Sequence, residues 1–431
     1  MALFAATHRA GAQVPFTLAG SLPNGTFIRS VTTADVNNDG KTDLICVRGN
    51  PSRLYVWTNS ADGGFVSNAV YTVGAFPYQV IAADVNNDGR PDFITANSTG
   101  NSLTVLINDG SGGLALAATL AAGSGTSPHS VAAADLNGDG KVDLVSANSQ
   151  NVSVTVWTNA GGGIFVSNAT YAVSTNPGWD NPQWVTTADL NGDGKPDIIC
   201  GNSGSYTYLA ILTNNGTGGF ASAPVPYVSA PVTCVIATDV NGDGKVDLVC
   251  DTGQVIVFTN NGSGGFALSG NYPVGPTPYA VVAADVNGDG MVDLITPNQG
   301  NNTLSVLTNN GKGVFGANTT LSVGSGPESL TAADLNGDGR VDLVSGNWNA
   351  GTLTVLTNAA TFLPRLTLKR SGNKVVVSWP AIWVNWTLQQ NTSLSLDNWI
   401  SFSGSIGNDG TTKSATNSSP AGNCFFRLLN P

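Results

Sequence analysis

The stretch DVNNDGKTD at residues 35–43 decides how this 431-residue chain folds, because its pattern D-x-N-x-D-G-x-x-D recurs six more times. The other copies begin at Asp84, Asp135, Asp189, Asp239, Asp285 and Asp334. Successive copies start 49, 51, 54, 50, 46 and 49 residues apart. Such spacings are typical of repeating four-stranded units and are far too long for the short turns of a β-helix. The chain is therefore predicted to contain seven similar units.

The residues around each acidic loop predict four short strands. Residues 130–134 (SVAAA) lead into one loop, and residues 143–147 (DLVSA) leave it. A third strand, such as residues 103–107 (LTVLI), is followed by an Asn/Gly turn, such as residues 214–219 (NNGTGG), and by an outer strand that opens with Phe. The predicted fold class is all-β: a seven-bladed β-propeller of four-stranded antiparallel blades, plus a small C-terminal β-sandwich.

The two ends of the repeat region are predicted to meet. The last unit ends after Asn358 without its own outer strand, whereas residues 14–19 (VPFTLA) match an outer strand and precede the first unit. We therefore expect residues 14–19 to pair into the unit that contains Asp334, which removes the open edges of the array. The expected domains are a leader remnant at 1–13, the propeller at 14–362 and a C-terminal β-sandwich module at 363–431.

The negative charge of the chain is concentrated in the acidic loops. The formal net charge is −11, and 21 of the 28 acidic residues, three in each of seven loops, belong to the motif. One Ca²⁺ in each loop would change the net charge to +3, since −11 + 14 = +3. The acidity therefore points to metal sites, and the lack of a basic patch argues against nucleic-acid binding. No apolar run is long enough for a membrane-spanning helix.

The residue types in the loops favour calcium. Ca²⁺ takes about six to eight oxygen ligands, and alternate residues of a tight acidic loop can direct oxygens at one centre. Positions 1, 3, 5 and 9 supply side chains, position 7 supplies a backbone carbonyl, and Gly at position 6 permits the turn. Up to seven ions are expected, one in each unit. The predicted ligands are Asp35, Asn37, Asp39, Lys41, Asp43; Asp84, Asn86, Asp88, Arg90, Asp92; Asp135, Asn137, Asp139, Lys141, Asp143; Asp189, Asn191, Asp193, Lys195, Asp197; Asp239, Asn241, Asp243, Lys245, Asp247; Asp285, Asn287, Asp289, Met291, Asp293; and Asp334, Asn336, Asp338, Arg340, Asp342.

Three alternatives to a calcium loop between strands fit the motif less well. An EF-hand would have Glu at position 12 and flanking helices, whereas the residues beside these loops predict strands. Zinc lacks its usual ligands, since His8 and His129 are the only histidines. The third alternative is that Asp and Asn cap tight turns without a metal. Three carboxylates in each of seven loops would then repel one another without a compensating cation.

The five cysteines favour free thiols. Cys46, Cys200 and Cys250 occupy equivalent strand positions, where a small buried residue fits. Cys234 and Cys250 flank one acidic loop and could face each other across paired strands, so a disulfide between them is an open alternative.

The acidic loops, strands such as SVAAAD and turns such as TNNGSGGF resemble the FG-GAP or VCBS repeats of integrin α-like propellers, including calcium-containing propeller lectins. The resemblance covers roughly residues 14–360. It implies calcium loops on one face and ligand-binding loops on the other, around the mouth of a central channel. Similar propellers act in adhesion and glycan binding, and a few belong to carbohydrate-active enzymes, so the fold does not decide the function. The C-terminal module resembles small immunoglobulin-like or fibronectin-like modules.

The position six residues before each loop is the main candidate for ligand binding, because it varies in charge and size while the strands around it repeat. It holds Arg29, Tyr78, His129, Gln183, Thr233, Tyr279 and Glu328. The long fourth unit adds Trp179, Asp180 and Trp184, and Trp348 lies in a corresponding loop of the last unit. Aromatic rings beside polar groups could stack on sugars. Ordinary exposed rim residues and, for Trp184, packing between blades are the alternatives. The predicted ligand-binding set is Arg29, Tyr78, His129, Trp179, Asp180, Tyr279, Glu328 and Trp348.

The sequence predicts a binding module more than an enzyme. It contains no G-x-S-x-G or G-x-x-x-x-G-K motif and only one Glu. The expected function is a secreted, monomeric calcium-binding propeller that binds carbohydrate or cell-surface ligands. A protein-adhesion or scaffold module, and a carbohydrate-active lyase or dehydratase using His129 and Glu328, are the alternatives. An extracellular location is expected because millimolar calcium outside cells fills weak sites.

Overall fold

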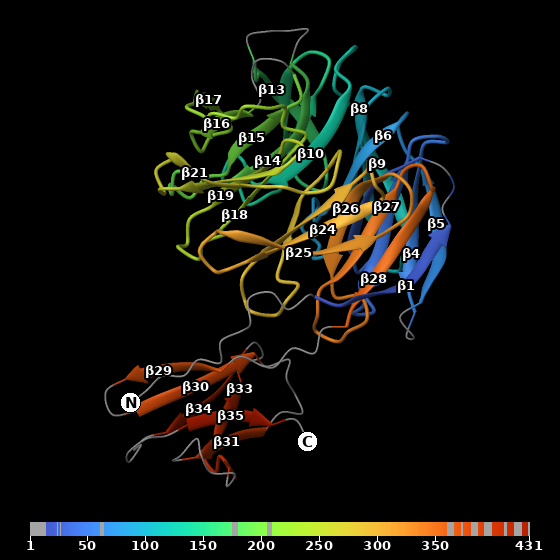
Figure 1. Cartoon of the computed structure of the whole chain (residues 1–431). Coiled ribbons are helices and arrows are strands. Elements are labelled where there is room, and N and C mark those ends of the chain that lie inside the picture. The colour runs from blue at the N-terminus through green and yellow to red at the C-terminus, as the bar shows by residue number, and fades with distance from the viewer. Residues whose placement is uncertain are drawn as a thin grey trace. The chain divides into compact units, whose positions relative to one another are not determined.

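The computed structural model describes residues 14–23, 25, 27–60, 64–174, 180–204, 209–359, 366–371, 374–380, 387–391, 399–408, 412–417 and 425–429. Every regular element in these ranges is a β-strand (Figure 1). The chain divides into two compact units, Gly11–Ala360 and Thr361–Pro431 with Met1–Ala10. The predicted leader remnant, residues 1–13, lies outside the described residues. Within the described ranges, no helix is long and apolar enough to cross a membrane.

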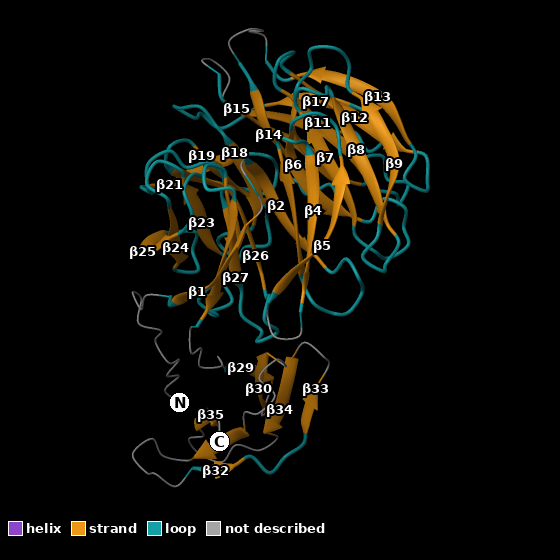
Figure 2. Cartoon of the chain, turned by 90° about the vertical axis from the view of Figure 1, so that its right-hand side faces the viewer, coloured by secondary structure: helices purple, strands orange, loops and turns teal. Residues whose placement is uncertain are grey.

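The larger unit contains seven four-stranded antiparallel sheets, drawn as orange arrows in Figure 2. Sheets 1 to 3 are formed by β2 (Ile28–Ala34), β3 (Asp43–Arg48), β4 (Arg53–Asn59), β5 (Phe65–Thr72); β6 (Pro77–Ala83), β7 (Asp92–Asn97), β8 (Ser102–Asn108), β9 (Leu114–Ala121); and β10 (Pro128–Ala134), β11 (Asp143–Asn148), β12 (Ser153–Asn159), β13 (Phe165–Ala172). Sheets 4 to 6 are formed by β14 (Pro182–Ala188), β15 (Asp197–Asn202), β16 (Leu209–Asn214), β17 (Phe220–Ala223); β18 (Cys234–Thr238), β19 (Asp247–Asp251), β20 (Val255–Asn260), β21 (Phe266–Tyr272); and β22 (Val282–Ala284), β23 (Asp293–Asn298), β24 (Thr303–Asn309), β25 (Phe315–Ser322). In each of these six sheets the strands are neighbours in chain order.

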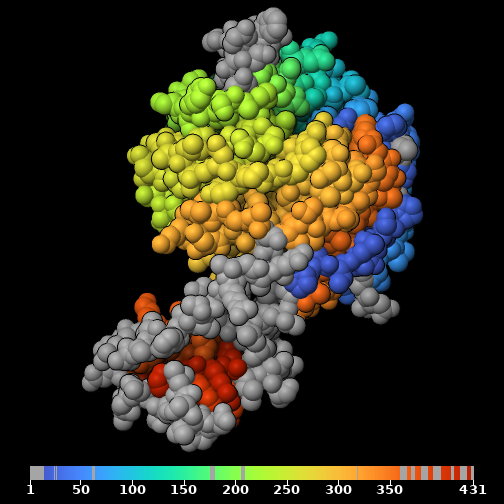
Figure 3. All heavy atoms as spheres, viewed as in Figure 1, coloured from blue at the N-terminus to red at the C-terminus, as the bar shows by residue number. Residues whose placement is uncertain are grey.

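Sheet 7 joins the two ends of the repeat region. It consists of β26 (Pro327–Ala333), β27 (Asp342–Asn347), β28 (Thr352–Asn358) and the N-terminal β1 (Phe16–Pro23). Strand β1 runs antiparallel to β28, with Phe16 opposite Asn358. In Figure 3 the blue N-terminal residues lie against the orange residues of this sheet. The predicted pairing of the N-terminal strand with the unit of Asp334 is confirmed.

Neighbouring sheets pack through apolar side chains. Val145 of sheet 3 and Ile198 of sheet 4 belong to one buried cluster, and Ile28 of sheet 1 shares another with Val344 of sheet 7. The near-continuous apolar runs of the second strands, such as residues 44–47 (LICV), explain this, because a blade that packs on both faces must bury both sides of its strands. Trp57 and Trp157 are buried in clusters of this kind. The four described cysteines are buried free thiols, so Cys234 and Cys250 do not form a disulfide.

The first strands of the sheets are the innermost strands of a ring. Strand β2 contacts β6 and β26, β10 contacts β6 and β14, and β14 contacts β18. Each acidic loop joins a first strand to the second, so that Ala34 lies opposite Asp43, while Ile28 at the other end lies opposite Arg48. The acidic loops and the residues six positions before them are therefore at opposite ends of the first strands.

The smaller unit contains two antiparallel sheets. They are formed by β29 (Thr367–Ser371), β30 (Lys374–Pro380), β34 (Thr412–Asn417), β33 (Ile406–Asn408) and by β32 (Ile400–Ser401), β31 (Thr387–Asn391), β35 (Phe425–Leu429), in these orders. Val377 and Trp379 of the first sheet share a buried cluster with Leu388 of the second, against which Phe426 packs. This arrangement is the predicted sandwich, while its relation to immunoglobulin-like modules stays a prediction.

Candidate functional site

The acidic loops are held in shape by hydrogen bonds from their own backbone. In the first loop Oδ1 of Asp35 and Oδ1 of Asn37 both accept from the N–H of Asp39, at 3.1 Å each. Oδ2 of Asp35 accepts from Gly40, whose φ of 80° suits glycine, and Oδ1 of Asp39 accepts from Lys41. The bonds from position 6 to position 1 and from position 7 to position 5 recur in all seven loops.

The Asp at position 9 has a different role from the other three loop side chains. Asp43 is fully buried, and its Oδ2 accepts from the N–H of Val36 while its Oδ1 accepts from the N–H of Asn59. Both bonds recur in every sheet. Burial raises the pKa of Asp43, and the nearby carboxylates of Asp39 and Asp35 raise it further. This aspartate therefore ties the loop to the third strand.

The asparagine at the end of the third strand links one sheet to the next, and sequence reasoning missed it. Nδ2 of Asn59 donates to the carbonyl of Thr42 in its own loop and to the carbonyl of Leu335 in the loop of sheet 7. Asn159, Asn214, Asn260, Asn309 and Asn358 make the same contact with the loop of another sheet. A sequence signal exists for this role, because an Asn ends the third strand of all seven units.

The loops offer oxygen donors that suit calcium, and the ligand set stays a prediction. Side-chain oxygens of positions 1, 3 and 5 surround the same turn, and hard oxygen donors are what Ca²⁺ prefers. The position-9 oxygens are already engaged by backbone N–H groups. In the part of the chain that the structure describes, no three Asp, Glu, His or Cys side chains converge as a metal-binding group. Oxygens of positions 1, 3 and 5 also accept from backbone N–H groups. These hydrogen bonds account for the loop shape and do not distinguish one predicted ligand position from another.

At the other end of the first strands, the residue six positions before the loop occupies a β-bulge. The pairing of β2 with β3 shifts register between Ile28 and Ser30, which leaves Arg29 without a partner opposite. The same shift occurs at Tyr78, His129, Gln183 and Glu328. A bulge redirects the side chain of the extra residue. The bulge places this side chain outside the regular cross-strand pairs, so its identity can vary while the strand residues beside it repeat.

Four of the bulge residues form a connected group with two aromatic residues, which we call the aromatic–arginine cluster: Arg29, Phe76, Tyr78, His129, Glu328 and Trp348. The guanidinium of Arg29 lies 3.6 Å from the ring centroid of Trp348, 4.6 Å from that of Tyr78 and 5.4 Å from that of Phe76. Nη1 of Arg29 donates to Oε2 of Glu328 at 2.7 Å. The cluster thus spans sheets 7, 1, 2 and 3.

His129 extends the cluster to sheet 4. Its ring stacks on Tyr78 with 4.2 Å between centroids and 3° between planes. Nδ1 of His129 lies 2.9 Å from Oε1 of Gln183, and Nε2 lies 3.3 Å from Oγ of Ser149. Burial lowers the pKa of His129, so the imidazole is neutral at pH 7. Its contacts position the ring, and Glu328 is engaged elsewhere, so the two do not form an acid–base pair.

Glu328 is buried, and both of its oxygens are engaged. Oε1 accepts from Nε2 of Gln299 at 2.6 Å, while Oε2 accepts from Arg29. Burial raises the pKa of Tyr78 to about 12, with Arg29 acting in the opposite direction and Tyr279 and Glu328 raising it further. Tyr279 belongs to sheet 6 and Tyr78 to sheet 2, so side chains from sheets that are not neighbours converge at this end of the ring.

The remaining predicted ligand-binding residues lie elsewhere. Asp180 is a correction: it is fully buried and accepts a hydrogen bond from the Ser174 hydroxyl, so it is not on an exposed loop. Thr233 donates to Oδ2 of the buried Asp251 and lies outside the cluster. Trp184 packs between sheets, as expected. Trp179 lies outside the described residues.

Two phenylalanines were also missed, Phe76 of the cluster and Phe27 beside it. Phe27 and Phe76 have φ angles of 72° and 53°. This left-handed region is unusual for a bulky side chain and marks a strained position. The ring of Phe27 lies 4.6 Å from that of Trp348, and Phe27 is 37% exposed. The equivalent position holds a left-handed residue in other sheets, including Ser127 and Thr277, but a sequence without a marked turn residue gives no sign of this.

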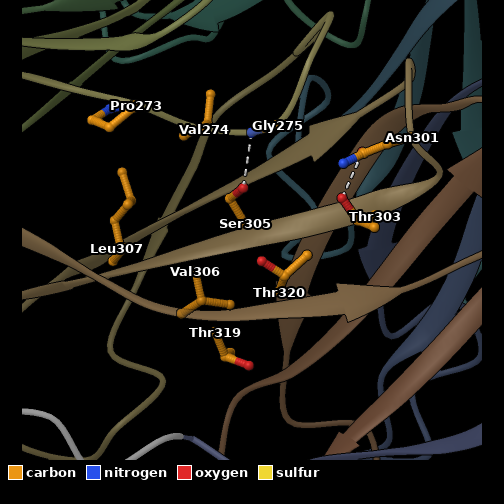
Figure 4. A pocket seen from close by; sticks show the side chains of 11 residues that line it. Pro273, Val274, Gly275, Asn301, Thr303, Ser305, Val306, Leu307, Thr319 and Thr320 are labelled. Carbon is orange, nitrogen blue, oxygen red and sulfur yellow. Dashed lines mark hydrogen bonds between the residues drawn. The ribbon is translucent and has the colours of Figure 1, made fainter.

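A separate hollow of about 540 Å³ lies between β24, β25 and residues 273–275 (Figure 4). Its lining carries no charged side chain. Ser305 accepts hydrogen bonds from the N–H of Gly275 and from Nδ2 of Asn298, and the Thr303 hydroxyl donates to Asn301. The hollow is neutral and hydroxyl-lined, which distinguishes it from the aromatic–arginine cluster.

Comparisons with known proteins agree with this architecture. The chain is 30% identical over 189 residues to a T-cell immunomodulatory protein homolog of Plasmodium yoelii yoelii, in a match that covers 40% of this chain and 20% of that relative. The crystal structure of BBS1N in complex with ARL6DN, soaked with lead, has a TM-score of 0.59 at 13% identity and covers 81% of this chain and 99% of that one. The same complex soaked with mercury gives a TM-score of 0.57 at 14% identity, covering 81% and 98%.

The model of the FG-GAP-like repeat matches six overlapping stretches, residues 35–95, 84–146, 135–200, 189–250, 239–296 and 285–345. Each stretch begins at the first Asp of one acidic loop and extends through the next loop, so the six matches contain all seven loops. Together they cover most of the chain. The repeated four-stranded sheets form a β-propeller, and the chain belongs to the FG-GAP-like repeat family.

Proposed function

We propose that this chain is a binding module that recognises a protein partner through the aromatic–arginine cluster and the exposed Phe27 beside it. The observation that carries the proposal is the convergence of Arg29, Tyr78 and Trp348 from three sheets at one end of the ring. Trp, Tyr and Arg are the residues that contribute most binding energy in protein interfaces.

The residues before the first strands support the same location. Their left-handed backbone recurs in sheets 3 and 6, at Ser127 and Thr277, and in sheets 1 and 2 the residue that adopts it is a phenylalanine. These two residues are Phe27 and Phe76, and both rings contact Trp348. They provide an aromatic surface at the end of the ring that is remote from the acidic loops.

A protein partner suits the cluster better than a sugar. Stacking on a sugar needs an open aromatic face, but Trp348 already contacts Arg29 and Phe27. The similar propeller BBS1N was solved in complex with ARL6DN, which is an example of this fold bound to a protein. An adhesion or scaffold role therefore takes precedence over the carbohydrate-binding role that the sequence favoured.

We also propose that the acidic loops hold Ca²⁺ through the oxygens of positions 1, 3 and 5 and the carbonyl of position 7. The oxygen donor set and the mutual repulsion of the carboxylates support this, because a cation would relieve the repulsion that raises the pKa of Asp43. Such sites would stiffen the loops that link neighbouring sheets. Filling by millimolar calcium would place the protein outside the cell.

The test compares partner capture by three forms of the chain. Phe27→Gly removes the exposed ring and suits the left-handed backbone, so the fold is preserved. Tyr227→Ala removes an aromatic ring that is 87% exposed and lies in the connection between sheets 4 and 5. Each form is incubated with the surface proteins of the source cells, cross-linked, and its partners are quantified by mass spectrometry.

We expect partners that the wild type and Tyr227→Ala capture equally, and that Phe27→Gly captures about tenfold less, since a central aromatic contact is worth about 2 kcal/mol or more. Equal capture by all three forms would contradict the proposal that the partner binds at the aromatic–arginine cluster and Phe27. A glycan array run with the same three forms separates the sugar-binding alternative, which predicts a sugar signal that Phe27→Gly loses.

A further inference from the structure

We infer that the hollow between β24 and β25 is a second binding site, selective for a neutral polyhydroxylated ligand such as a single sugar residue. It is independent of the proposed protein-binding surface. Its volume of about 540 Å³ lies within the range of small-molecule pockets, about 300–1,000 Å³. Figure 4 shows side chains from β24, from β25 and from residues 273–275 around one space.

At Ser305 the lining is one methyl group smaller than the equivalent position of three other sheets. Ser305 occupies the position that Thr104, Thr155 and Thr354 occupy in sheets 2, 3 and 7. It keeps the same hydrogen bond from a backbone glycine, at 3.2 Å from Gly275, as Thr104 makes with Gly74 at 3.1 Å. The serine therefore keeps the hydrogen bond that the threonines make and lacks only their methyl group.

Cross-strand contacts of Ser305 differ from those in sheet 3 and resemble those in sheet 2, where Thr104 also accepts from a glycine N–H and an Asn side chain. In sheet 3, Oγ1 of Thr155 lies 3.1 Å from Oγ1 of its partner Thr170, so the two hydroxyls satisfy each other. In sheet 6, Ser305 is opposite Thr320 and accepts two hydrogen bonds from other groups. No described residue accepts the Ser305 hydroxyl proton or bonds to the Thr320 hydroxyl. Both side chains line the hollow, and each retains capacity for a ligand hydroxyl.

The lining defines the chemical class of the ligand. None of its eleven residues is charged, so there is no group to compensate an anion or a cation. Hydroxyl groups of Thr303, Ser305 and Thr320 stand beside the apolar Pro273 and Leu307. A sugar ring presents the matching combination of hydroxyls and C–H groups. With no aromatic ring in the lining, the affinity is expected to be low, with a Kd on the order of 1 mM.

The test is ligand-observed saturation-transfer NMR with the methyl glycosides of glucose, galactose and mannose, with N-acetylglucosamine, and with glucuronate as the charged counterpart. Ser305→Thr adds the methyl group that other sheets carry. Thr320→Val removes a hydroxyl from an exposed residue without changing its shape, so folding is not at issue. Thr155→Ser is the matched control, because it makes the reverse exchange in sheet 3.

At least one neutral sugar is expected to give a signal, glucuronate is not, and both Ser305→Thr and Thr320→Val should weaken binding by about tenfold. Thr155→Ser and Phe27→Gly should bind the sugar as the wild type does. The inference is overturned if none of the neutral sugars binds, or if either sheet 6 variant binds as the wild type does. Because Phe27 does not line the hollow, failure of this test leaves the proposed protein-binding surface unaffected.

Discussion

Arg29 and Glu328 are hydrogen-bonded at 2.7 Å across the seam where the first and last sheets meet. They are 299 residues apart in the chain, and their side chains are 15% and 5% exposed. Two contacts therefore join the ends of the repeat region. Strand β1 pairs with β28 at the outer edge of sheet 7, and this ion pair links the first strands of sheets 1 and 7. The bond also fixes the guanidinium that the aromatic rings surround.

The ion pair makes a prediction about stability. Glu328→Leu leaves the Arg29 charge buried without its partner and should lower the free energy of unfolding by about 3 kcal/mol. Arg29→Met combined with Glu328→Leu should recover most of the loss, because no uncompensated charge remains. Urea unfolding of the single and double variants measures this. A double variant no more stable than Glu328→Leu would contradict the stabilising role of the pair.

A buried carboxyl in sheet 5 makes the fold pH-sensitive. Asp251 is fully buried, and burial raises its pKa to about 7 in the folded state, from 3.8. The folded protein therefore holds a proton that the unfolded chain releases, so stability should fall as pH rises from about 4 to about 7. At the equivalent position, four residues after the last Asp of the loop, the other sheets hold uncharged residues: Val47, Ala96, Ala147, Gly201, Pro297 and Gly346.

Asp251→Asn should remove this dependence. At pH 8 the variant should be more stable than the wild type by up to about 4 kcal/mol, and at pH 4 the two should differ little. The measurement is the free energy of unfolding in urea at both values of pH. Parallel pH profiles for the two proteins would show that Asp251 titrates normally.

The third-strand asparagines are predicted to matter more than the exposed asparagines beside them. Nδ2 of Asn214 donates to the carbonyls of Leu136 and Pro196, both at 2.9 Å. Asn214→Ala leaves these buried carbonyls unsatisfied and should cost about 2–3 kcal/mol. Asn215→Ala, at an exposed turn, should cost less than about 1 kcal/mol. Thermal unfolding of the pair provides the comparison, and equal losses would refute the link between sheets.

Calcium is predicted to stabilise the fold without being required to form it, because the loops are already closed by their own hydrogen bonds. Replacing millimolar Ca²⁺ with excess chelator should lower the unfolding midpoint. The loss in stability should be about 2–3 kcal/mol for each filled loop if Ca²⁺ was at a hundred times its Kd. Mg²⁺ at the same concentration is the control and should not restore the midpoint. A midpoint that is unchanged by chelator would leave turn capping as the sole role of the motif.

The architecture was predictable because the repeat is local and its period is regular. Seven copies of one loop predicted the sheets, and the missing outer strand after Asn358 predicted the closure by β1. The contacts of the aromatic–arginine cluster were not predictable from the repeat. The bulge at Arg29 and the left-handed backbone at Phe27 depend on the local register, for which the sequence carries no turn signal.

The loop chemistry shows a second limit of sequence reasoning. Counting oxygen donors treated Asp39 and Asp43 alike, but burial separates them: Asp39 stays at the surface, whereas Asp43 is enclosed by the third strand. Asp180 was misplaced for a related reason, since an acidic residue in a long loop usually points to solvent. Only the folded chain shows that it is buried beside Ser174.

Hydrogen–deuterium exchange on the chain with and without a captured partner locates the protein-binding surface. We expect the partner to slow exchange at residues 27–31, 76–80 and 347–351, which carry most of the aromatic–arginine cluster, and to leave residues 35–43 and their equivalents unchanged. Slowed exchange at the acidic loops, with none at the cluster, would place the partner on the opposite end of the ring and contradict the proposed function.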